Sequence, residues 1–269
     1  MLIHATAIVD PRAELGADVR VGPFAVIGAG VVLHEGVEVG AHVVLEGPCE
    51  LGARTRVFPF AAIGHEAQDR KFRGEPSGVV IGARCTLREG VTVHRGTAGG
   101  DGVTRVGDDV LLMAQSHVAH DCVVGNDVVL ANSAALAGHV VVGEGAVLGG
   151  LAAVHQFARI GRLAMVGGGA MVAQDVPPFC VAQGDRARLF GLNLVGLRRA
   201  VVSPERIEAL RAAYRALFLA GEPRASVLAR LSDIATYEVA ELLAAVRGSR
   251  RGTCRAAGDL DDAGGSGDA

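Results

Sequence analysis

The chain has 269 residues, half of them hydrophobic, and a formal net charge of −3. This length and hydrophobic content are sufficient for one large domain or two ordinary ones with a sizeable core. The charge excludes an overall attraction to nucleic acid or to an anionic membrane surface, and no uncharged apolar run is long enough to span a bilayer.

Neither the start of the chain nor its cysteines indicate a secreted protein. The stretch MLIHATAIVDPR lacks the basic region and the apolar core of a secretory signal, which predicts a cytoplasmic location. The five cysteines are an odd number without a CxxC spacing, which argues against a disulfide framework and against a thiolate zinc site.

A six-residue repeat dominates the first two thirds of the chain. Every sixth residue is aliphatic over residues 3–63, 81–93 and 106–172. Such hexads are typical of a parallel β-helix, in which short strands form the faces of a prism and the aliphatic residues fill its interior. We therefore predict a β-helix over residues 1–185, with three hexads, or 18 residues, in each coil. Three cysteines take a second inward position, four residues after an aliphatic one: Cys49, Cys85 and Cys122.

Two segments interrupt the hexads and predict loops that leave the prism. They are HEAQDRKFRGEPSGVV (65–80) and RGTAGGDGVTR (95–105). Insertions in solenoids commonly lie on one face, which is often the binding face. We therefore expect both loops to lie near a ligand site.

The C-terminal part of the chain changes from hexads to helix signals. Ser203, which precedes a proline, marks a helix start, and a second helical region is expected over 224–247. We therefore predict a C-terminal helical domain over residues 186–248. The tail over residues 249–269 is rich in Gly, Ala and Asp without periodicity, which predicts disorder.

Polar residues 18 positions apart lie one above another on successive coils, about 4.8 Å apart. This register brings together five polar residues and a glycine: His120, Asp121, Gly138, His139, His155 and Gln156. A lone outward histidine is usually a solvated surface residue. Alignment over three coils favours a functional site instead.

A histidine beside a carboxylate suits general-base catalysis, because the carboxylate fixes the tautomer and stabilises the imidazolium. We interpret His120 and Asp121 as such a pair, with the Gly138 N–H one coil above as donor to a developing oxyanion. Neither Ser116 nor Ser133 has an evident base in line with it. Direct attack by a substrate hydroxyl is therefore favoured over a covalent enzyme intermediate.

Zinc binding is the alternative interpretation of these histidines. Neutral imidazoles are common zinc ligands, and His117 and His120 could face a third histidine from another subunit, as in gamma-class carbonic anhydrases. The aligned Gly138 and Gln156 are poor ligands, so we favour chemistry that needs neither a metal nor another cofactor.

Lysine and arginine are used very unevenly. Lys71 is the only lysine and lies in the first loop beside Asp69. This choice suggests a site that requires a compact ammonium, such as a contact to a phosphate or a sugar. Nine arginines and three glutamates lie between residues 186 and 230. Such an excess is typical of a solvated helix face or of a docking site for a nucleotide phosphate or an acidic carrier protein.

Several motifs together resemble the UDP-N-acetylglucosamine 3-O-acyltransferase family over about residues 1–245. They are VTVHRGT (91–97), HVAHDCVVGN (117–126), LAGHV (136–140), AVHQF (153–157) and VAQDVPPF (172–179). The resemblance implies a left-handed β-helix and a homotrimer with active sites between adjacent subunits. It also implies transfer of an R-3-hydroxyacyl chain from acyl carrier protein to the glucosamine 3-hydroxyl of UDP-N-acetylglucosamine, the first step of lipid A synthesis.

The same resemblance implies roles for individual residues. His120 matches the general base, Asp121 its partner and Gly138 the oxyanion donor, while His139 matches a histidine near the reacting centre. The residues that match the acyl-donor groove are His155 and Gln156. The residues that match sugar-nucleotide contacts are Asp69, Lys71, His94 and His117.

Acyl length and nucleotide binding depend on two further regions. Gly168 matches the family's acyl-length position, where a glycine leaves the groove open, so we predict a 3-hydroxymyristoyl-like chain rather than a decanoyl one. The nucleotide end departs from the family pattern, because Val195 replaces a glutamate and Ala200 replaces an arginine. Arg199 is retained as a substrate contact.

Other functions stay open at this point. A sister family acylates a 2-amino group, but it carries an N-terminal domain before its hexads, whereas these hexads begin at residue 3. A hexapeptide acetyltransferase that uses coenzyme A would usually lack the C-terminal helices. An oligomeric binding platform would show no acyl transfer at all.

Overall fold

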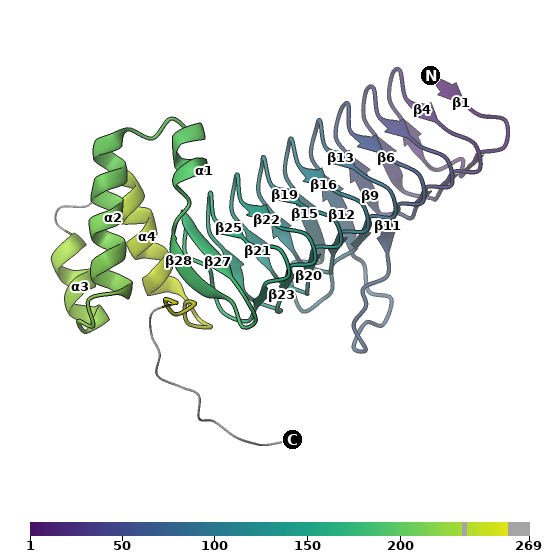
Figure 1. The fold of residues 1–269 in the computed structure, drawn as a ribbon. Helices are drawn as coiled ribbons and strands as arrows, with labels where there is room; N and C mark the ends of the chain where they lie inside the picture. Colours follow the sequence, from purple (N-terminus) through teal and green to yellow (C-terminus); the bar gives the residue numbers. More distant parts are fainter. Residues whose placement is uncertain (233–235, 258–269) are drawn as a thin grey trace.

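The computed structural model describes residues 1–232 and 236–257 and shows a long prism that ends in a group of helices (Figure 1). The prism is a left-handed parallel β-helix, as the hexads and the family resemblance predict. The N-terminus lies at the end of the prism farthest from the helices (Figure 1).

Three sheets form the faces of the prism in the part of the chain that the structure describes. The 11-stranded face contains β1 (Leu2–Ile3), β4 (Arg20–Val21), β7 (Glu38–Val39), β10 (Arg56–Val57), β13 (Thr86–Leu87), β16 (Leu111–Leu112), β19 (Val129–Leu130), β22 (Val147–Leu148), β25 (Met165–Val166), β27 (Cys180–Gln183) and β28 (Arg188–Leu192). The nine-stranded face contains β2 (Ile8–Val9), β5 (Val26–Ile27), β8 (Val44–Leu45), β11 (Ala62–His65), β14 (Thr92–His94), β17 (His117–Val118), β20 (Ala135–Leu136), β23 (Ala153–Val154) and β26 (Met171–Val172). The eight-stranded face contains β3 (Glu14–Leu15), β6 (Val31–Leu33), β9 (Cys49–Leu51), β12 (Gly78–Ile81), β15 (Val103–Val106), β18 (Val123–Val124), β21 (Val141–Val142) and β24 (Arg159–Ile160).

The hexad aliphatics fill the interior of the prism. Leu130, Leu136 and Leu148 are fully buried, and each such side chain stabilises the fold by roughly 1.5–3 kcal/mol relative to exposure. The small inward position is also confirmed, because Cys49, Cys85 and Cys122 are buried free thiols. The prism is therefore a packed scaffold that leaves only outward side chains for chemistry.

The coil length of 18 residues is confirmed where the polar residues gather. His117 of β17 pairs with Ala135 of β20, which pairs with Ala153 of β23. The register changes at the loops, where Thr92 of β14 pairs with His117, 25 residues farther along the chain, and in the last coil, where Met165 of β25 pairs with Val181, 16 residues farther along. Residues on either side of a loop still stack, but at a spacing that an 18-residue count does not find.

The two predicted loops are shorter than expected. The first covers 66–77 between β11 and β12, and the second covers 95–102 between β14 and β15. The sequence ranges 65–80 and 95–105 were too wide because their last residues pair as strands in the eight-stranded face. The first loop projects from the body of the prism (Figure 1).

The C-terminal part begins with a hairpin rather than a helix. β28 pairs antiparallel with β27 and extends the 11-stranded sheet past residue 185, into the range predicted as helical. The helices are α1 (Leu194–Arg199), α2 (Pro204–Phe218), α3 (Arg224–Ser232) and α4 (Tyr237–Gly248). Ser203 caps α2, as predicted, by accepting from the Arg206 N–H, whereas the single helical region expected over 224–247 is two helices. None of the helices in the described chain has the length and hydrophobicity needed to cross a membrane.

The predicted disordered tail is wrong for residues 249–257. Thr253 bridges to Asp175, and Ser249 Oγ donates to Asp175 Oδ2 at 2.6 Å. Cys254 and Ala256 are buried. The prediction of disorder used composition alone. Composition does not show that the buried Asp175 carboxylate and the unpaired backbone groups beside it need hydrogen-bond partners, which this short segment supplies. Residues 258–269, the rest of that prediction, lie outside the described residues.

Candidate active site

Polar residues from three successive coils meet in one groove of the nine-stranded face. The His139 N–H donates to the His120 carbonyl at 3.0 Å, and the Phe157 N–H donates to the Gly138 carbonyl at 3.1 Å. These bonds hold successive coils in the predicted stack. The groove has a volume of about 390 Å³, and its polar lining residues are Gln68, His117, His120 and Gln156.

His120 and Asp121 form a hydrogen-bonded pair beside this groove. His120 Nδ1 lies 2.9 Å from Asp121 Oδ2. A carboxylate can only accept, so Nδ1 carries the proton and Nε2 holds the free lone pair. The imidazole is 12% exposed and the carboxylate 2% exposed. The pair therefore presents one basic nitrogen to the groove and keeps its acid out of water.

Gly138 lies directly against the imidazole. A Cβ at this position would stand 2.6 Å from His120 Nε2, closer than real Cβ contacts come. In the described chain the Gly138 N–H donates to no backbone carbonyl. The glycine thus brings an unused N–H donor close to the basic nitrogen.

The second loop reaches the carboxylate of Asp121. The Thr97 N–H donates to Asp121 Oδ1 at 2.9 Å, and Thr97 Oγ1 donates to Oδ2 at 2.7 Å. The Asp121 N–H in turn donates to Thr104 Oγ1 at 2.8 Å. Buried polar groups need such partners, and here both carboxylate oxygens have them.

Asp121 and His139 occupy corners of the prism with left-handed backbone. Their φ angles are 59° and 61°, and the corners at Ser133 and Arg54 have φ of 58° and 61°. Because the same conformation recurs at corners away from the histidines, it belongs to the coil geometry and not to strain at the site.

His139 lies above the pair and packs on an aromatic ring. Its ring stacks on Phe157 at 4.5 Å and stands perpendicular to the His120 ring at 5.1 Å. Its Nε2 is 3.7 Å from Asp121 Oδ2, beyond hydrogen-bond distance. Burial lowers the pKa of His139, and the Asp121 charge opposes that shift. His139 therefore serves best as a neutral polar wall of the site.

Two more histidines lie on the other side of the groove. His94 Nδ1 donates to the Glu66 carbonyl at 2.7 Å, and its ring meets the His117 ring edge-on at 5.3 Å. His117 Nδ1 lies 2.7 Å from Thr92 Oγ1. Burial lowers the pKa of His94. The pKa of His117 is lowered to about 4, mainly by burial and to a smaller extent by the charges of the neighbouring His94 and His120.

We expect His117 to stay neutral throughout the range from pH 5 to 8. Its folded pKa of about 4 lies below its ordinary value of 6.5, so the unfolded chain binds more protons between these values. This residue therefore reduces native stability as the pH falls from about 6.5 to about 4. NMR titration of the labelled imidazole checks this, and a midpoint near 6.5 would contradict it.

One compact set of candidate metal ligands occurs in the described chain. It consists of His120, Asp121 and His139, whose ligand atoms lie within 4.8 Å of one another. The zinc interpretation had instead paired His117 with His120. The Nδ1 atom of His117 is engaged with Thr92, and that of His120 donates to Asp121. These bonds leave the Nε2 atom of both histidines free, an arrangement that serves a general base and a metal ligand equally, so the metal content of the protein has to be measured.

The remaining predicted residues lie around this centre rather than in it. Asp69 acts on His139 through its charge, and its Oδ1 accepts the Lys71 N–H at 2.9 Å. The Lys71 side chain is exposed and forms no ion pair within the described chain. Gly168 is exposed, and a Cβ added to it would meet the Gly150 carbonyl oxygen at 3.3 Å. Arg199 is exposed at the end of α1.

His155 opens on a neighbouring groove of about 430 Å³. This groove shares Ala153 and Val154 with the histidine groove, and it also contains Arg186 and Arg251. The two grooves therefore run together along the nine-stranded face. Gln156 belongs to the first of them and His155 to the second.

Sequence reasoning missed several residues of the site. Thr97, Gln68 and Phe157 were not singled out, although HRGT and HQF were recognised as motifs. Phe157 follows from the same count as His139, 18 residues farther along. Thr97 and Gln68 lie in loops, where counting by coils gives no position.

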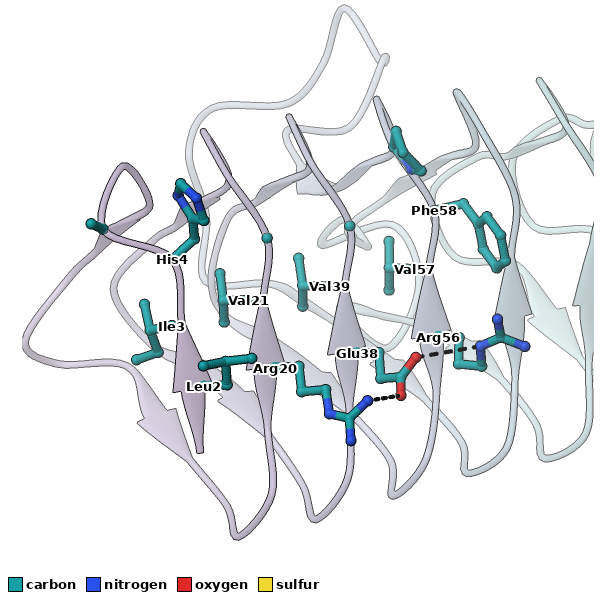
Figure 2. Close-up of a pocket in the computed structure, with 14 residues that line it drawn as sticks. Leu2, Ile3, His4, Arg20, Val21, Glu38, Val39, Arg56, Val57 and Phe58 are labelled. Atoms are coloured by element: carbon teal, nitrogen blue, oxygen red, sulfur yellow. Dashed lines mark hydrogen bonds and ion pairs between the residues drawn. The ribbon is translucent and has the colours of Figure 1, made fainter.

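A larger groove of about 620 Å³ lies far from these residues, at the N-terminal end of the prism (Figure 2). Figure 2 shows Arg20 and Arg56 on either side of Glu38, at nitrogen–oxygen distances of 3.4 and 3.6 Å. The other lining is mostly aliphatic, and it includes no histidine–carboxylate pair. Size alone would select this groove, but the acid–base chemistry lies in the smaller one.

Comparisons with known proteins agree with the geometry. Residues 12–47 and 104–138 match the family model described as bacterial transferase hexapeptide (six repeats). Residues 175–254 match the model described as UDP N-acetylglucosamine O-acyltransferase, domain 2.

Relatives match along nearly the whole chain. A protein of Thermodesulfovibrio yellowstonii named acyl-[acyl-carrier-protein]–UDP-N-acetylglucosamine O-acyltransferase is 47% identical over 257 residues, which are 94% of this chain and 99% of the relative. The structure of UDP-N-acetylglucosamine O-acyltransferase from Moraxella catarrhalis is 37% identical with a TM-score of 0.93, covering 95% of this chain and 100% of the other. The UDP-N-acetylglucosamine acyltransferase of Arabidopsis is 34% identical with a TM-score of 0.83, covering 94% and 100%.

Proposed function

This chain belongs to the UDP-N-acetylglucosamine O-acyltransferase family and is an acyltransferase, and from that premise we propose how it acts. Its donor is acyl carrier protein bearing an R-3-hydroxyacyl chain, and its acceptor is the glucosamine 3-hydroxyl of UDP-N-acetylglucosamine. The product would enter lipid A synthesis as its first intermediate. The observation that most supports this function is the buried His120–Asp121 pair beside the Gly138 N–H in a groove.

The first step in this proposal is proton removal by His120. Asp121 holds the Nδ1–H at 2.9 Å, so Nε2 is the nitrogen that accepts the proton of the sugar hydroxyl. As the imidazolium forms, the buried carboxylate stabilises its charge. The sugar oxygen then forms a bond to the thioester carbon of the acyl donor.

The second step is collapse of the tetrahedral intermediate. The attack has turned the carbonyl oxygen into an oxyanion, to which the free Gly138 N–H donates, and on collapse this oxygen re-forms its double bond to carbon. The carbon–sulfur bond breaks, the sulfur leaves as the thiol of the carrier protein, and the His120 imidazolium returns the proton. The ester remains on the sugar, and the enzyme regains its starting protonation state.

A covalent enzyme intermediate is not needed in this scheme. Ser116 is fully buried with its Oγ out of contact with solvent, and Ser133 Oγ lies 3.5 Å from Gln115 instead of beside a base. An activated nucleophile requires a base within hydrogen-bond reach. Neither serine is therefore placed to act as a nucleophile, which favours direct attack by the substrate hydroxyl.

The sugar nucleotide is assigned to the side of the groove that the first loop borders. Asp69, Lys71, His94 and His117 would contact the sugar and its phosphates, with Arg199 reaching the nucleotide. Neutral His117 and His94 suit hydrogen bonds to sugar hydroxyls, since burial lowers both pKa values. The exposed Lys71 ammonium suits a phosphate oxygen.

Replacing Lys71 with alanine is expected to raise the KM for UDP-N-acetylglucosamine by about tenfold, with kcat changed little, because a phosphate contact is made equally in ground and transition states. Initial-rate kinetics on both substrates measure this. Arg70→Ala in the same exposed loop is the control, and an unchanged KM in the Lys71 variant would contradict the assignment.

The acyl chain is assigned to the grooves on the later coils. His155 and Gln156 would border it, and Gly168, one coil above Gly150, would lie at its far end. The exposed glycine places no side chain in that path. We therefore propose a 3-hydroxymyristoyl-like chain.

We expect kcat/KM for 3-hydroxymyristoyl carrier protein to exceed that for the 3-hydroxydecanoyl donor by at least about tenfold, because four more methylenes add apolar burial. Gly168→Leu should reverse this order by filling the end of the path. Comparable turnover of both donors by the unaltered enzyme would contradict the assignment, and mass spectrometry of the products measures it directly.

The proposal also includes the oligomeric state of the protein and its location in the cell. The family resemblance favours a homotrimer with shared active sites in the cytoplasm, and the exposed Arg198, Arg199 and Arg215 offer cations to an acidic carrier protein. The competing 2-amino acylation, coenzyme A-dependent acetylation and simple binding are distinguished by the product. An ester on the glucosamine 3-oxygen, located by NMR, supports the proposal, whereas an amide, an acetyl product or no transfer would contradict it.

A further inference from the structure

Thr97 contacts the acid–base pair from outside the residues that the family resemblance assigns. We propose that Thr97 is a positioning residue for the reaction, which holds the Asp121 carboxylate so that His120 Nε2 points at the attacking hydroxyl. This inference rests on the proposed role of His120 as general base. Thr97 acts through Asp121 and touches no reacting atom.

The contacts of Asp121 leave it few alternatives. The carboxylate is 2% exposed, so it depends on protein donors for stabilisation. His120 supplies one donor, and Thr97 supplies two, one to each oxygen. Among the residues described around the carboxylate, Thr97 is the one that donates a hydrogen bond to each of its two oxygens.

Two bonds to different oxygens fix the plane of the carboxylate. The last torsion of an aspartate side chain has a broad energy minimum, so one bond from His120 would leave the plane free to rotate. The Thr97 N–H on Oδ1 and hydroxyl on Oδ2 remove that freedom. The direction from Oδ2 to His120 Nδ1, and with it the aim of Nε2, is thereby set.

The second loop is built for this close approach. A Cβ at Gly100 would stand 2.4 Å from Asp121 Oδ1, so a glycine is required for the loop to pack on the carboxylate. The loop is held from the other side by Glu75, whose Oε1 accepts the Ala98 N–H at 3.1 Å. Thr97 is therefore supported by both loops that interrupt the hexads.

The test compares Thr97→Val with the conservative Thr97→Ser. Valine keeps the N–H bond to Oδ1 but removes the hydroxyl from Oδ2, so the buried oxygen that holds His120 Nδ1–H loses its second donor and can shift with the imidazole. We therefore expect kcat to fall by about tenfold to a hundredfold while both KM values stay within about threefold. Serine should recover kcat to within about threefold of the unaltered enzyme, because it restores the bond to Oδ2.

Thr55→Val is the matched control. Thr55 is equally buried, and its Oγ1 donates to the Gly82 carbonyl at 2.8 Å, away from the histidines. We expect this variant to lose thermal stability similarly but to keep kcat within about twofold. A loss of stability without a loss of kcat in Thr97→Val would overturn the proposal, as would a serine variant no better than valine.

A second pair of variants avoids the buried position. Gly100→Ala should push against Oδ1 and lower kcat, whereas Gly248→Ala at the end of α4, whose added methyl meets no atom within 4 Å, should not. Gly100 lies in the exposed part of the loop, so its variant should fold. Equal kcat in the two variants would count against Thr97 and its loop as positioning elements.

His120→Ala separates this inference from the proposed function. If that variant keeps full activity, the general-base assignment fails and the role of Thr97 fails with it. If it loses activity while Thr97→Val and Gly100→Ala match the unaltered enzyme, only the positioning role is wrong.

Discussion

Replacing His120 with alanine is expected to lower kcat by at least about 100-fold, which is the lower range for loss of a general base. Among the residues that the structure describes, the imidazole is the one basic group that lies both in the groove and on a buried carboxylate. Without it, the sugar hydroxyl has no acceptor for its proton, and the leaving sulfur has no donor. Substrate KM values should change much less, because binding groups around the groove remain.

The control for His120 is His34→Ala. His34 Nε2 lies 2.7 Å from Glu50 Oε1 on an early coil, so this is also a histidine–carboxylate pair, but it is exposed. Its removal should leave kcat within about twofold, since surface pairs contribute little. If His120→Ala retained more than about a tenth of the activity, another group would have to serve as base.

Replacing Gly138 with alanine is expected to lower kcat by about 100-fold, because displacing a catalytic group by 1 Å can have that effect. The new methyl group would lie 2.5 Å from His120 Cε1 and 2.6 Å from Nε2, so the imidazole must move. The same methyl group would crowd the N–H that is assigned to the oxyanion. Steady-state kinetics with thermal unfolding measurements separate this effect from simple destabilisation.

Gly248→Ala is the matched control for Gly138. Gly248 lies at the end of α4, and a Cβ there would meet no atom within 4 Å. Its kcat should equal that of the unaltered enzyme. A Gly138→Ala variant with full kcat would show that neither the imidazole position nor the backbone donor is as the proposal requires.

The prism and its stacking register were predictable because a hexad repeat translates directly into geometry. Each coil repeats one conformation, so counting by 18 from His120 reaches Gly138 and Gln156 without knowledge of the structure. The inward positions follow equally well, as the buried Cys122 shows. Periodic structure is the kind that sequence reports most reliably.

The loops and chain ends were less predictable because no period governs them. Thr97 reaches Asp121 across 24 residues of sequence, through a loop whose path depends on Glu75 and on the glycines around it. The segment near Thr253 was expected to be disordered, yet it pairs with Asp175 at the end of the prism. Such contacts depend on tertiary partners, which composition and local pattern do not encode.

The most direct test of the proposed activity is transfer of a 3-hydroxymyristoyl group from acyl carrier protein to UDP-N-acetylglucosamine, measured for the unaltered enzyme and His120→Ala together with their metal content. We expect transfer by an enzyme without bound zinc, and collapse of the rate in the variant. No transfer by an enzyme that carries stoichiometric zinc would contradict the acyltransferase mechanism and favour the anhydrase-like alternative.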